Sequence, residues 1–434
     1  MFAVYAESFS SDDPLSGLVL GERPEPEVPD GWTTVTVKAA SLNHHDLWSL
    51  RGVGLREEAL PMILGCDAAG IDEDGNEVVV HAVISEPSWK GDETLDPKRS
   101  LLSEKHQGTL ADRVAVPRRN VVPKPASLSF EEAACLPTAW LTAYRMLFTQ
   151  GGLKAGDTVL VQGAGGGVAT AAITLARAAG LKVVATSRDE AKRARALEIG
   201  AHEVFESGAR LPVKVDGVIE TVGRATWSHS IRSLRPGGVL VVSGTTSGPK
   251  LDDAELTRIF FLQLRVVGST MGTRSELASL VSMLDASGAR PLVDRTLPMD
   301  QARDGFAAMA QGDLFGKIVF TRLGRTRSGV PTSSPAPAPA SAPTSPGRCS
   351  TAATSWSSWP ATRPGPASSS RSTPGRGPSS PTWPTSPRSP RSTSPARSTR
   401  WCTRLEWSRW ARSASCRRAT GAPSSTSTCW PRPS

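Results

Sequence analysis

Residues 158–171 read TVLVQGAGGGVATA, and this stretch decides the fold. Apolar residues at 158–162 predict a short strand, four glycines follow within five positions, and apolar residues then recur at helical spacing. Glycine lets the backbone turn tightly and approach a phosphate closely, and the next helix adds free N–H groups and the positive end of its dipole. A second expected strand at 182–186 completes a pattern that predicts dinucleotide binding. The cofactor contacts expected here are Gly163, Gly165, Gly166, Gly167 and Val168.

Around this loop, expected strands and helices alternate along the chain. The strands are expected at 158–162, 182–186, 217–220, 239–243 and 265–268, and the helices between them at 168–179 and 189–199. Such alternation predicts right-handed βαβ units, and therefore a doubly wound parallel sheet with helices on both faces. The chain is expected to belong to the α/β class.

The chain before residue 138 follows a different pattern. Runs at 33–39, 77–84 and 111–117 are apolar or alternate with period two, which is typical of an antiparallel β domain. Beyond the parallel sheet, a helix is expected at 275–285 and a strand within FGKIVF at 315–320. We therefore divide the chain into a β-rich segment at 1–137, a dinucleotide-binding domain at 138–270, a short segment at 271–323 and a tail at 324–434.

The end of the second expected strand indicates which dinucleotide binds. A carboxylate there would bind the ribose hydroxyls and repel a 2′-phosphate. The sequence instead has Ser187 and Arg188, with Lys192 one helical turn further on, and such cations pair with a phosphate dianion. Because Asp189 and Glu190 follow at once, the basic residues are also compatible with a solvated helix start. We expect NADPH, with Ser187, Arg188 and Lys192 at its 2′-phosphate.

The charge of the chain is divided between two unlike segments. The 434 residues carry +9, whereas residues 325–434 contain 16 Arg, no Lys and one acid, which gives +15. Residues 1–324 therefore carry 9 − 15 = −6, so no nucleic-acid partner is expected for this body. The body has only Cys66 and Cys135, no signal-peptide pattern, and no apolar run of the roughly 18 residues that span a membrane. A cytoplasmic protein without a membrane partner is expected.

The tail at 324–434 has a composition unlike that of a folded domain. Ser, Pro, Arg, Thr and Ala dominate it from residue 325 on, and Lys, Asp, Asn, Gln, His, Tyr, Phe, Ile and Met are absent there. Such a segment buries too little apolar surface to offset its chain entropy, which predicts disorder. Nearly all its residue types have G or C as the middle codon base, as expected when GC-rich DNA is read out of frame. We favour a frameshift product; a genuine disordered extension and a nucleic-acid-binding Arg/Trp tail are the alternatives.

Five further motifs carry a family resemblance. They are LGCDAAG at 64–70 followed by Gly75, ACLPTAWLTAYRML at 134–147, ETVG at 220–223, RPGG at 235–238 and FGKIV at 315–319. Together with the glycine-rich loop, they make residues 1–322 resemble the medium-chain dehydrogenase/reductase superfamily. The resemblance implies a GroES-like catalytic domain, begun at 1–137 and completed at 271–323, around a Rossmann domain. It also implies a homodimer formed by edge-to-edge pairing of sheets.

The zinc ligands of the metal-dependent family members are replaced in this chain. By the resemblance, the three positions hold Asn43, Cys66 and Thr138, and an amide or a hydroxyl is a poor zinc ligand. Residues 85–107, where the family places a structural zinc site of four cysteines, contain none. Cys66, His45 and Asp67 are donors for a conceivable rebuilt site, but such a cysteine is more often a small buried side chain. We expect no metal, as in the zinc-free quinone oxidoreductases and enoyl reductases.

Without a metal, the reactions that suit the site are reductions of activated double bonds. Alcohol oxidation needs a Lewis acid to stabilise an alkoxide, whereas a quinone or an α,β-unsaturated carbonyl is already activated by conjugation. We expect Asn43 and Thr138 to hydrogen-bond the substrate carbonyl or the nicotinamide ribose. His45 is expected to supply a proton, unless it is a structural histidine. Asp46 either belongs to this site or caps a helix that begins at Leu47.

The remaining cofactor contacts are expected at strand ends, where parallel sheets bind ligands, and at positions that the resemblance supplies. These residues are His44, Thr142, Thr221, Val222, Gly223, Gly244, Thr245, Met271, Gly272 and Lys317. His81 and His106 lie outside the motifs and receive no role. Two alternatives to a zinc-free reductase remain: an alcohol dehydrogenase with a degenerate metal site, and a non-catalytic cofactor-binding protein.

Overall fold

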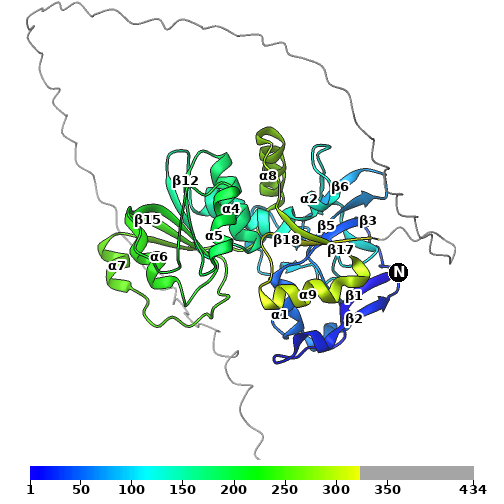
Figure 1. Ribbon diagram of the computed structural model, residues 1–434. Helices are drawn as coiled ribbons and strands as arrows, with labels where there is room; N and C mark the ends of the chain where they lie inside the picture. Colours follow the sequence, from blue (N-terminus) through cyan, green and yellow to red (C-terminus); the bar gives the residue numbers. More distant parts are fainter. Residues whose placement is uncertain (323–434) are drawn as a thin grey trace, which may run out of the picture. The chain divides into compact units, whose positions relative to one another are not determined.

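The computed structural model describes residues 1–322 (Figure 1). Every interpretation of the tail concerns residues 324–434, which lie outside the described residues. Within residues 1–322, no helix is long and apolar enough to cross a membrane.

The first strands and the last strands of residues 1–322 share one β-rich domain. Its elements are β1 (Phe2–Ala6), β2 (Leu18–Glu22), β3 (Trp32–Ser41), α1 (His44–Leu50), β4 (Met62–Ile63), β5 (Asp67–Asp72), β6 (Glu77–Val80), β7 (Val83–Ile84), β8 (Ser100–Leu101), β9 (Arg113–Pro117), β10 (Val121–Pro123), α8 (Arg274–Ser287), β17 (Val293–Pro298), α9 (Ala302–Gln311) and β18 (Lys317–Thr321). The main sheet has the order β10-β6-β5-β3-β18-β17, with β9 also paired to β3. Strand β18 runs antiparallel to β3, with Phe320 opposite Ala40, so the chain returns to its first domain (Figure 1).

The apolar run at 77–84 forms two strands in the structure. Strand β6 ends at Val80 and β7 begins at Val83. The side-chain amide of Asn120 donates hydrogen bonds to the carbonyls of His81 (2.8 Å) and Val83 (2.7 Å), and the His81 N–H donates to the Asn120 carbonyl. A side chain thus replaces the neighbouring strand as the hydrogen-bond partner, and the periodicity of the sequence does not reveal this break.

The glycine-rich stretch lies in a six-stranded parallel sheet. The elements of this domain are β11 (Thr158–Val161), α4 (Gly167–Ala178), β12 (Lys182–Thr186), α5 (Glu190–Glu198), β13 (Glu203–Phe205), β14 (Val215–Glu220), α6 (Trp227–Ser233), β15 (Leu234–Val242), α7 (Leu256–Phe261) and β16 (Arg265–Gly268). The strand order is β13-β12-β11-β14-β15-β16. Alternate residues of β11 face opposite layers: Val159 and Val161 pack with α4, whereas Leu160 packs with Ile231 of α6. Apolar runs rather than alternation are expected for strands covered on both faces, and the predicted α/β fold class is confirmed.

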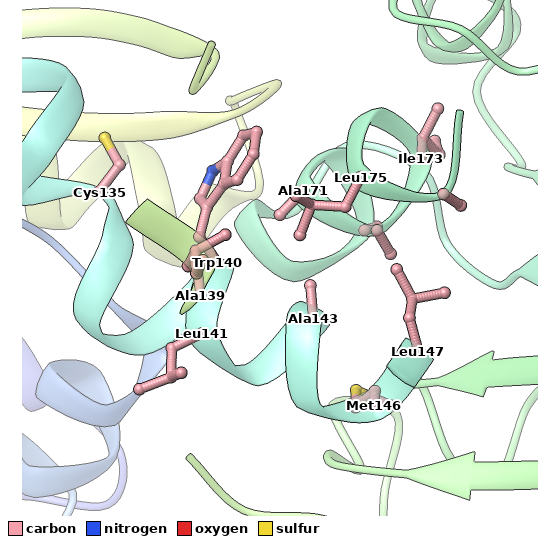
Figure 2. Packing of buried hydrophobic residues seen from close by; sticks show 14 of the residues in the cluster. Cys135, Ala139, Trp140, Leu141, Ala143, Met146, Leu147, Ala171, Ile173 and Leu175 are labelled. Atoms are coloured by element: carbon pink, nitrogen blue, oxygen red, sulfur yellow. The ribbon is translucent and has the colours of Figure 1, made fainter. Parts of the chain in front are cut away.

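A long helical segment connects the two domains. It consists of α2 (Phe130–Ala134), a π-helical turn η5 (Leu136–Trp140), α3 (Leu141–Tyr144) and a second π-helical turn η6 (Arg145–Gln150). Figure 2 shows Ala143 and Leu147 of this segment pointing toward α4, near Ala171 and Leu175. Small side chains bring the two helices close together, which places the turn η5 beside the glycine-rich loop.

Candidate active site

A buried ammonium group lies at the centre of the candidate site. Lys317, the first residue of β18, is 2% exposed, and its Nζ donates to the carbonyl of Leu42 (2.8 Å). The same Nζ donates to Oδ1 of Asn43 (2.6 Å) and lies 3.2 Å from Oδ2 of Asp67. Oδ2 of Asp67 also accepts from Asn43 Nδ2 (2.9 Å) and from the Ser41 hydroxyl (2.7 Å). Both polar atoms of the Asn43 amide are therefore already bonded to protein groups.

Asp46 caps the start of helix α1 through hydrogen bonds to backbone N–H groups. The expectation that this helix begins at Leu47 is wrong. The helix begins at His44, with Asn43 as its N-cap. The buried carboxylate of Asp46 accepts hydrogen bonds from the N–H groups of Asn43 and Gly65, both at 2.9 Å. An acid in the first turn can reach back to the N-cap N–H as in a capping box, and residue type alone does not distinguish it from a cap. Asp46 thereby joins the Asn43 position to the loop before β5.

His45 contacts protein groups through both ring nitrogens. Its Nε2 lies 3.1 Å from Oε1 of Glu104, and its Nδ1 lies 3.4 Å from Sγ of Cys66 and 3.5 Å from Oγ of Ser103. Burial opposes the charged form of His45, but Cys66, Asp46 and Glu104 outweigh it and raise the pKa of His45 well above its usual value. Burial raises the pKa of the Cys66 thiol. Both ring nitrogens of His45 therefore contact protein groups, and neither is left free.

His44 is exposed, unlike its two neighbours in the chain. Desolvation of the ring and, next, the charge of Lys317 lower the pKa of His44. A neutral imidazole on the first turn of α1 can donate or accept one hydrogen bond at its exposed edge. That position is compatible with the cofactor contact expected for His44.

The turn η5 carries hydroxyl and indole groups without partners. Oγ1 of Thr138 and Nε1 of Trp140 are buried and have no hydrogen-bond partner within the protein, and Oδ1 of Asp67 is in the same state. Strand β5 and η5 pack against each other, so Thr138 and Asp67 belong to one region. Thr142 is buried one turn further along, on α3. Unpartnered buried polar atoms are uncommon, so the Thr138 hydroxyl is a candidate for a ligand contact that it would reach by rotation of its side chain.

The glycine-rich loop provides free backbone donors at the start of α4. The N–H groups of Gly167, Val168 and Ala169 have no acceptor among residues 1–322, as is usual for the first turn of a helix. Gly165 has a φ of +133°, which only glycine adopts readily, and its carbonyl accepts from the N–H of Gly316 at 2.9 Å. A Cβ atom on Gly166 would meet nothing within 4 Å. The loop therefore has the donors and the open space that a pyrophosphate needs.

The two basic residues after β12 lie differently. The Arg188 side chain is exposed and has no hydrogen-bond or ion-pair partner among the described residues, so it is available to a phosphate. Nζ of Lys192 instead donates to the carbonyl of Gly312 at 2.8 Å, and its side chain lies over Gly165. The carboxylate of Asp189 accepts from the Lys192 N–H as the cap of α5. Lys192 thus lies at the pyrophosphate loop rather than beside Arg188.

Two further loops at the carboxyl edge of the parallel sheet lie against each other. A Cβ atom on Gly223 would come 2.9 Å from Cα of Thr245, and one on Gly244 would come 3.0 Å from the Thr221 carbonyl. The buried carboxylate of Glu220 accepts from the N–H groups of Val222 (2.7 Å) and Gly223 (3.0 Å). The expected contacts after β14 and β15 therefore form one surface, and Glu220 holds its shape. The sequence identifies the motif that contains Glu220, but it does not reveal that the carboxylate holds this loop.

The segment after β16 is held by a histidine that received no role from the sequence. Met271 is buried with a φ of +49°, an uncommon conformation for a side chain of this size. Nε2 of His81 lies 2.9 Å from the carbonyl of Gly272, which joins the first and the last segment of the β-rich domain. Burial lowers the pKa of His81, so the neutral ring donates this hydrogen bond. His81 thus fixes the backbone at Met271 and Gly272.

Comparisons with known proteins agree with this geometry. A family model described as zinc-binding dehydrogenase matches residues 167–286, and one described as alcohol dehydrogenase GroES-like domain matches residues 29–126. A zinc-type alcohol dehydrogenase-like protein of Schizosaccharomyces pombe is 30% identical over 339 residues, which cover 71% of this chain and 97% of that protein. The chain belongs to the medium-chain dehydrogenase/reductase superfamily.

Members of this superfamily with different activities are similar to the chain. Acryloyl-coenzyme A reductase of Sulfurisphaera tokodaii is 27% identical over 324 residues, which cover 70% of this chain and 97% of the relative. The crystal structure of an NAD-dependent alcohol dehydrogenase superposes with a TM-score of 0.68 at 32% identity, covering 74% of this chain and 99% of that one. The chain is therefore an oxidoreductase of the NAD(P)-dependent kind, and these likenesses do not distinguish its substrate.

The catalytic zinc of metal-dependent superfamily members does not fit the donor atoms present here. The Asn43 oxygen already accepts from an ammonium, the Cys66 thiol donates to the Leu102 carbonyl (3.2 Å), and Thr138 offers a neutral hydroxyl. Within residues 1–322, no three His, Cys, Asp or Glu side chains are placed to hold a metal together. A dication close to the Lys317 ammonium would also be repelled by it.

Proposed function

We propose that this superfamily member is an NADPH-dependent reductase of quinones or α,β-unsaturated carbonyl compounds that works without catalytic zinc. The observation that carries the proposal is the set of donor atoms at the three positions that the resemblance assigns to zinc ligands: the Asn43 oxygen accepts from the Lys317 ammonium, the Cys66 thiol donates to the Leu102 carbonyl, and Thr138 offers a neutral hydroxyl. Such donors do not suit zinc, so the site lacks the Lewis acid that activates an alcohol. Activated double bonds do not require that activation.

The cofactor preference rests on the end of β12. Arg188 is unpaired, Ser187 stands where a carboxylate would repel a 2′-phosphate, and Asp189 is occupied as a helix cap. A phosphate dianion is expected to bind Arg188 and the Ser187 hydroxyl, while the N–H groups at the start of α4 and Lys192 face the pyrophosphate. When bound, the dihydronicotinamide supplies the hydride.

The protein's own groups then have two tasks in this proposal. The unpartnered hydroxyl of Thr138 binds the substrate oxygen and stabilises the charge that develops there. His45 holds a proton, and Glu104, whose side chain is 28% exposed, connects it to solvent. Donation from His45 requires the ring to turn away from Cys66 and Ser103, since both contacts lie at its second nitrogen. Asn43 positions Lys317 and Asp67 instead of contacting substrate.

The test is a panel of enones, quinones and primary and secondary alcohols, measured with NADPH and with NADH, together with zinc analysis of the purified protein. We expect turnover of an enone or quinone with NADPH and substoichiometric zinc. Thr138→Val removes the hydroxyl and keeps the shape, and it should lower kcat about tenfold or more without changing cofactor affinity. One tightly held zinc per chain with alcohol oxidation would replace this proposal by a metal-dependent alcohol dehydrogenase. Tight cofactor binding without any turnover would favour the non-catalytic alternative.

We also propose a homodimer formed at the free edge of the parallel sheet. Strand β16 is the last strand of that sheet. Beside it, Leu256, Phe260 and Phe261 of α7 are 68%, 70% and 77% exposed, and Val266 of β16 is 42% exposed. An open strand edge with exposed aromatic side chains favours pairing with a second copy. Light scattering should find a dimer, and Phe260→Asp combined with Phe261→Asp should yield monomers.

A further inference from the structure

A hollow lies under the crossover between β13 and β14, on the parallel-sheet domain. Residues 206–214 make this crossover without a helix, although it passes two intervening strands and such connections usually contain one. The hollow between this loop and α6 measures about 480 Å³, within the range of small-molecule sites. We call it the crossover hollow; its lining residues are Gly208, Arg210, Leu211, Pro212, Val213, Lys214, His229, Arg232 and Ser233.

The lining of the crossover hollow is positively charged. Arg210, Lys214 and Arg232 line it, and no carboxylate does. Arg232 pairs with Glu255 (2.8 Å), and the Lys214 ammonium donates to the Arg232 carbonyl. The exposed guanidinium of Arg210 has no hydrogen-bond or ion-pair partner among residues 1–322. An unpaired guanidinium beside two further cations favours a phosphate, which it can bind through two parallel hydrogen bonds.

The inner wall of the crossover hollow is tied to the cofactor side of the sheet through His229. Nε2 of His229 donates to the carbonyl of Ala209 (2.8 Å), because a carbonyl oxygen only accepts. Its Nδ1 therefore accepts from Nε2 of Gln162, also at 2.8 Å. Gln162 directly precedes the first glycine of the pyrophosphate loop. Two hydrogen bonds, from Ala209 to His229 and from His229 to Gln162, thus connect the loop that carries Arg210 with the glycine-rich loop.

The side-chain amide of Gln162 also connects, through hydrogen bonds, to the ends of β12 and β14. Oε1 of Gln162 accepts from the Thr186 hydroxyl at the end of β12, and its Nε2 donates to Ser230 Oγ (3.0 Å). Ser230 in turn donates to Oε2 of Glu220 at 2.6 Å, and Glu220 holds the loop after β14. A ligand that orders residues 206–214 would therefore also order the three loops that bind the cofactor.

We propose that the crossover hollow binds a phosphorylated small molecule, and that its binding strengthens cofactor binding. Arg210 and Lys214 hold the phosphate, and the apolar side chains of Leu211 and Val213 contact the organic part. A ligand held by Arg210 and Lys214 fixes the position of the Ala209 carbonyl, and the hydrogen bonds through His229 and Gln162 then favour one arrangement at the start of the glycine-rich loop. By linkage, the cofactor strengthens phosphate binding by the same factor. The proposal does not depend on which substrate the enzyme reduces.

The first experiment measures phosphate binding to the full chain saturated with NADP, so that the pyrophosphate loop is already occupied. Calorimetric titration should show saturable binding of phenyl phosphate, tighter than that of inorganic phosphate because its ring contacts Leu211 and Val213. Arg210→Glu should weaken phenyl phosphate binding about tenfold or more, whereas Arg210→Lys keeps most of it. Lys154→Glu, an equal charge change at an exposed lysine before β11, should leave it unchanged. Absence of saturable binding, or equal weakening in both glutamate variants, overturns the site.

The second experiment measures the coupling. The Kd of NADPH is determined with and without saturating phenyl phosphate, in the unmodified protein and in Arg210→Glu. We expect phenyl phosphate to tighten NADPH binding about fivefold or more in the unmodified protein and not in the variant. His229→Phe, which keeps a ring but removes both hydrogen bonds, should lose the coupling. The coupling is overturned if phenyl phosphate does not tighten NADPH binding in the unmodified protein, or if it tightens binding equally in Arg210→Glu.

Discussion

The two sides of the candidate site differ in how much of their chemistry depends on side chains. The pyrophosphate loop is built from glycines and backbone N–H groups at the start of α4, and its geometry suits a dinucleotide as it stands. On the other side, the resemblance assigns Asn43, Cys66 and Thr138 to the positions of metal ligands, and a lysine ammonium is bonded to Asn43. Backbone donors survive most substitutions, whereas a metal site is lost when its donor atoms change. In the proposed function, the cofactor half of the superfamily site is retained and the catalytic half has changed its chemistry.

The largest expected effect comes from removing the ammonium on the catalytic side. Lys317→Met leaves the fully buried Asp67 carboxylate without its cation, and breaking a buried pair from one side lowers the free energy of unfolding by about 3–5 kcal/mol. Urea denaturation measures this loss. The double variant with Asp67→Asn removes both charges and should regain a large part of it. If the single variant were as stable as the unmodified protein, Lys317 would not be what neutralises this side of the site.

On the cofactor side, adding a side chain to the glycine-rich loop should weaken NADPH binding. Gly165→Val introduces a Cβ atom 3.0 Å from Cδ of Lys192, at a φ of +133°. Strain of this kind amounts to about 1–3 kcal/mol, so NADPH should bind roughly 5- to 150-fold more weakly by fluorescence titration. Gly91→Val is the control, because Gly91 also has a positive φ but lies in the other domain with open space around it. It should lower Tm and leave the Kd of NADPH unchanged.

On the cofactor side, the proposal assigns one side chain, Arg188, to the preference for NADPH over NADH. Arg188→Ala should reduce the preference for NADPH over NADH about tenfold, because it removes one charge-assisted contact and leaves the pyrophosphate loop intact. Kd values for both cofactors measure the preference. Lys154→Ala removes an equally exposed cation of the same domain and should change neither affinity. An unchanged preference in Arg188→Ala would mean that Arg188 does not contact the cofactor.

The same contrast explains which features of the fold and of the candidate site can be predicted from the sequence. The glycine-rich turn between β11 and α4 could be predicted because strand, glycines and helix follow one another along the chain, and the fold class followed from the same alternation. The ion pair of Lys317 with Asp67 joins residues 250 positions apart, and Glu104 reaches His45 from a segment without periodic pattern. Such contacts are made by tertiary packing, so no local pattern in the sequence predicts them. Lys192 is close to Arg188 in sequence, but its Nζ donates to the Gly312 carbonyl, and sequence spacing alone does not reveal this contact.

The smallest expected effect is a pH dependence of stability on the catalytic side. The pKa of His45 is raised in the folded protein because its contacts with Cys66, Asp46 and Glu104 outweigh burial. A raised pKa means that the folded state binds the proton more tightly, so the stabilisation is fully present below the ordinary value of about 6.5 and is lost as the pH rises through the raised pKa. Urea denaturation at several pH values should therefore find the advantage of the unmodified protein over His45→Gln shrinking as the pH rises above about 6.5.

A second histidine provides the matched comparison with the opposite sign. Desolvation and, next, Arg177 lower the pKa of His202 in the parallel-sheet domain. The advantage over His202→Gln should therefore shrink as the pH falls below about 6.5, because only the unfolded chain then gains the proton. Two opposite slopes would show that the catalytic side holds a proton at neutral pH and the cofactor domain does not. Parallel slopes would mean that His45 carries no stabilised proton, and the proton supply assigned to it would have to come from another group.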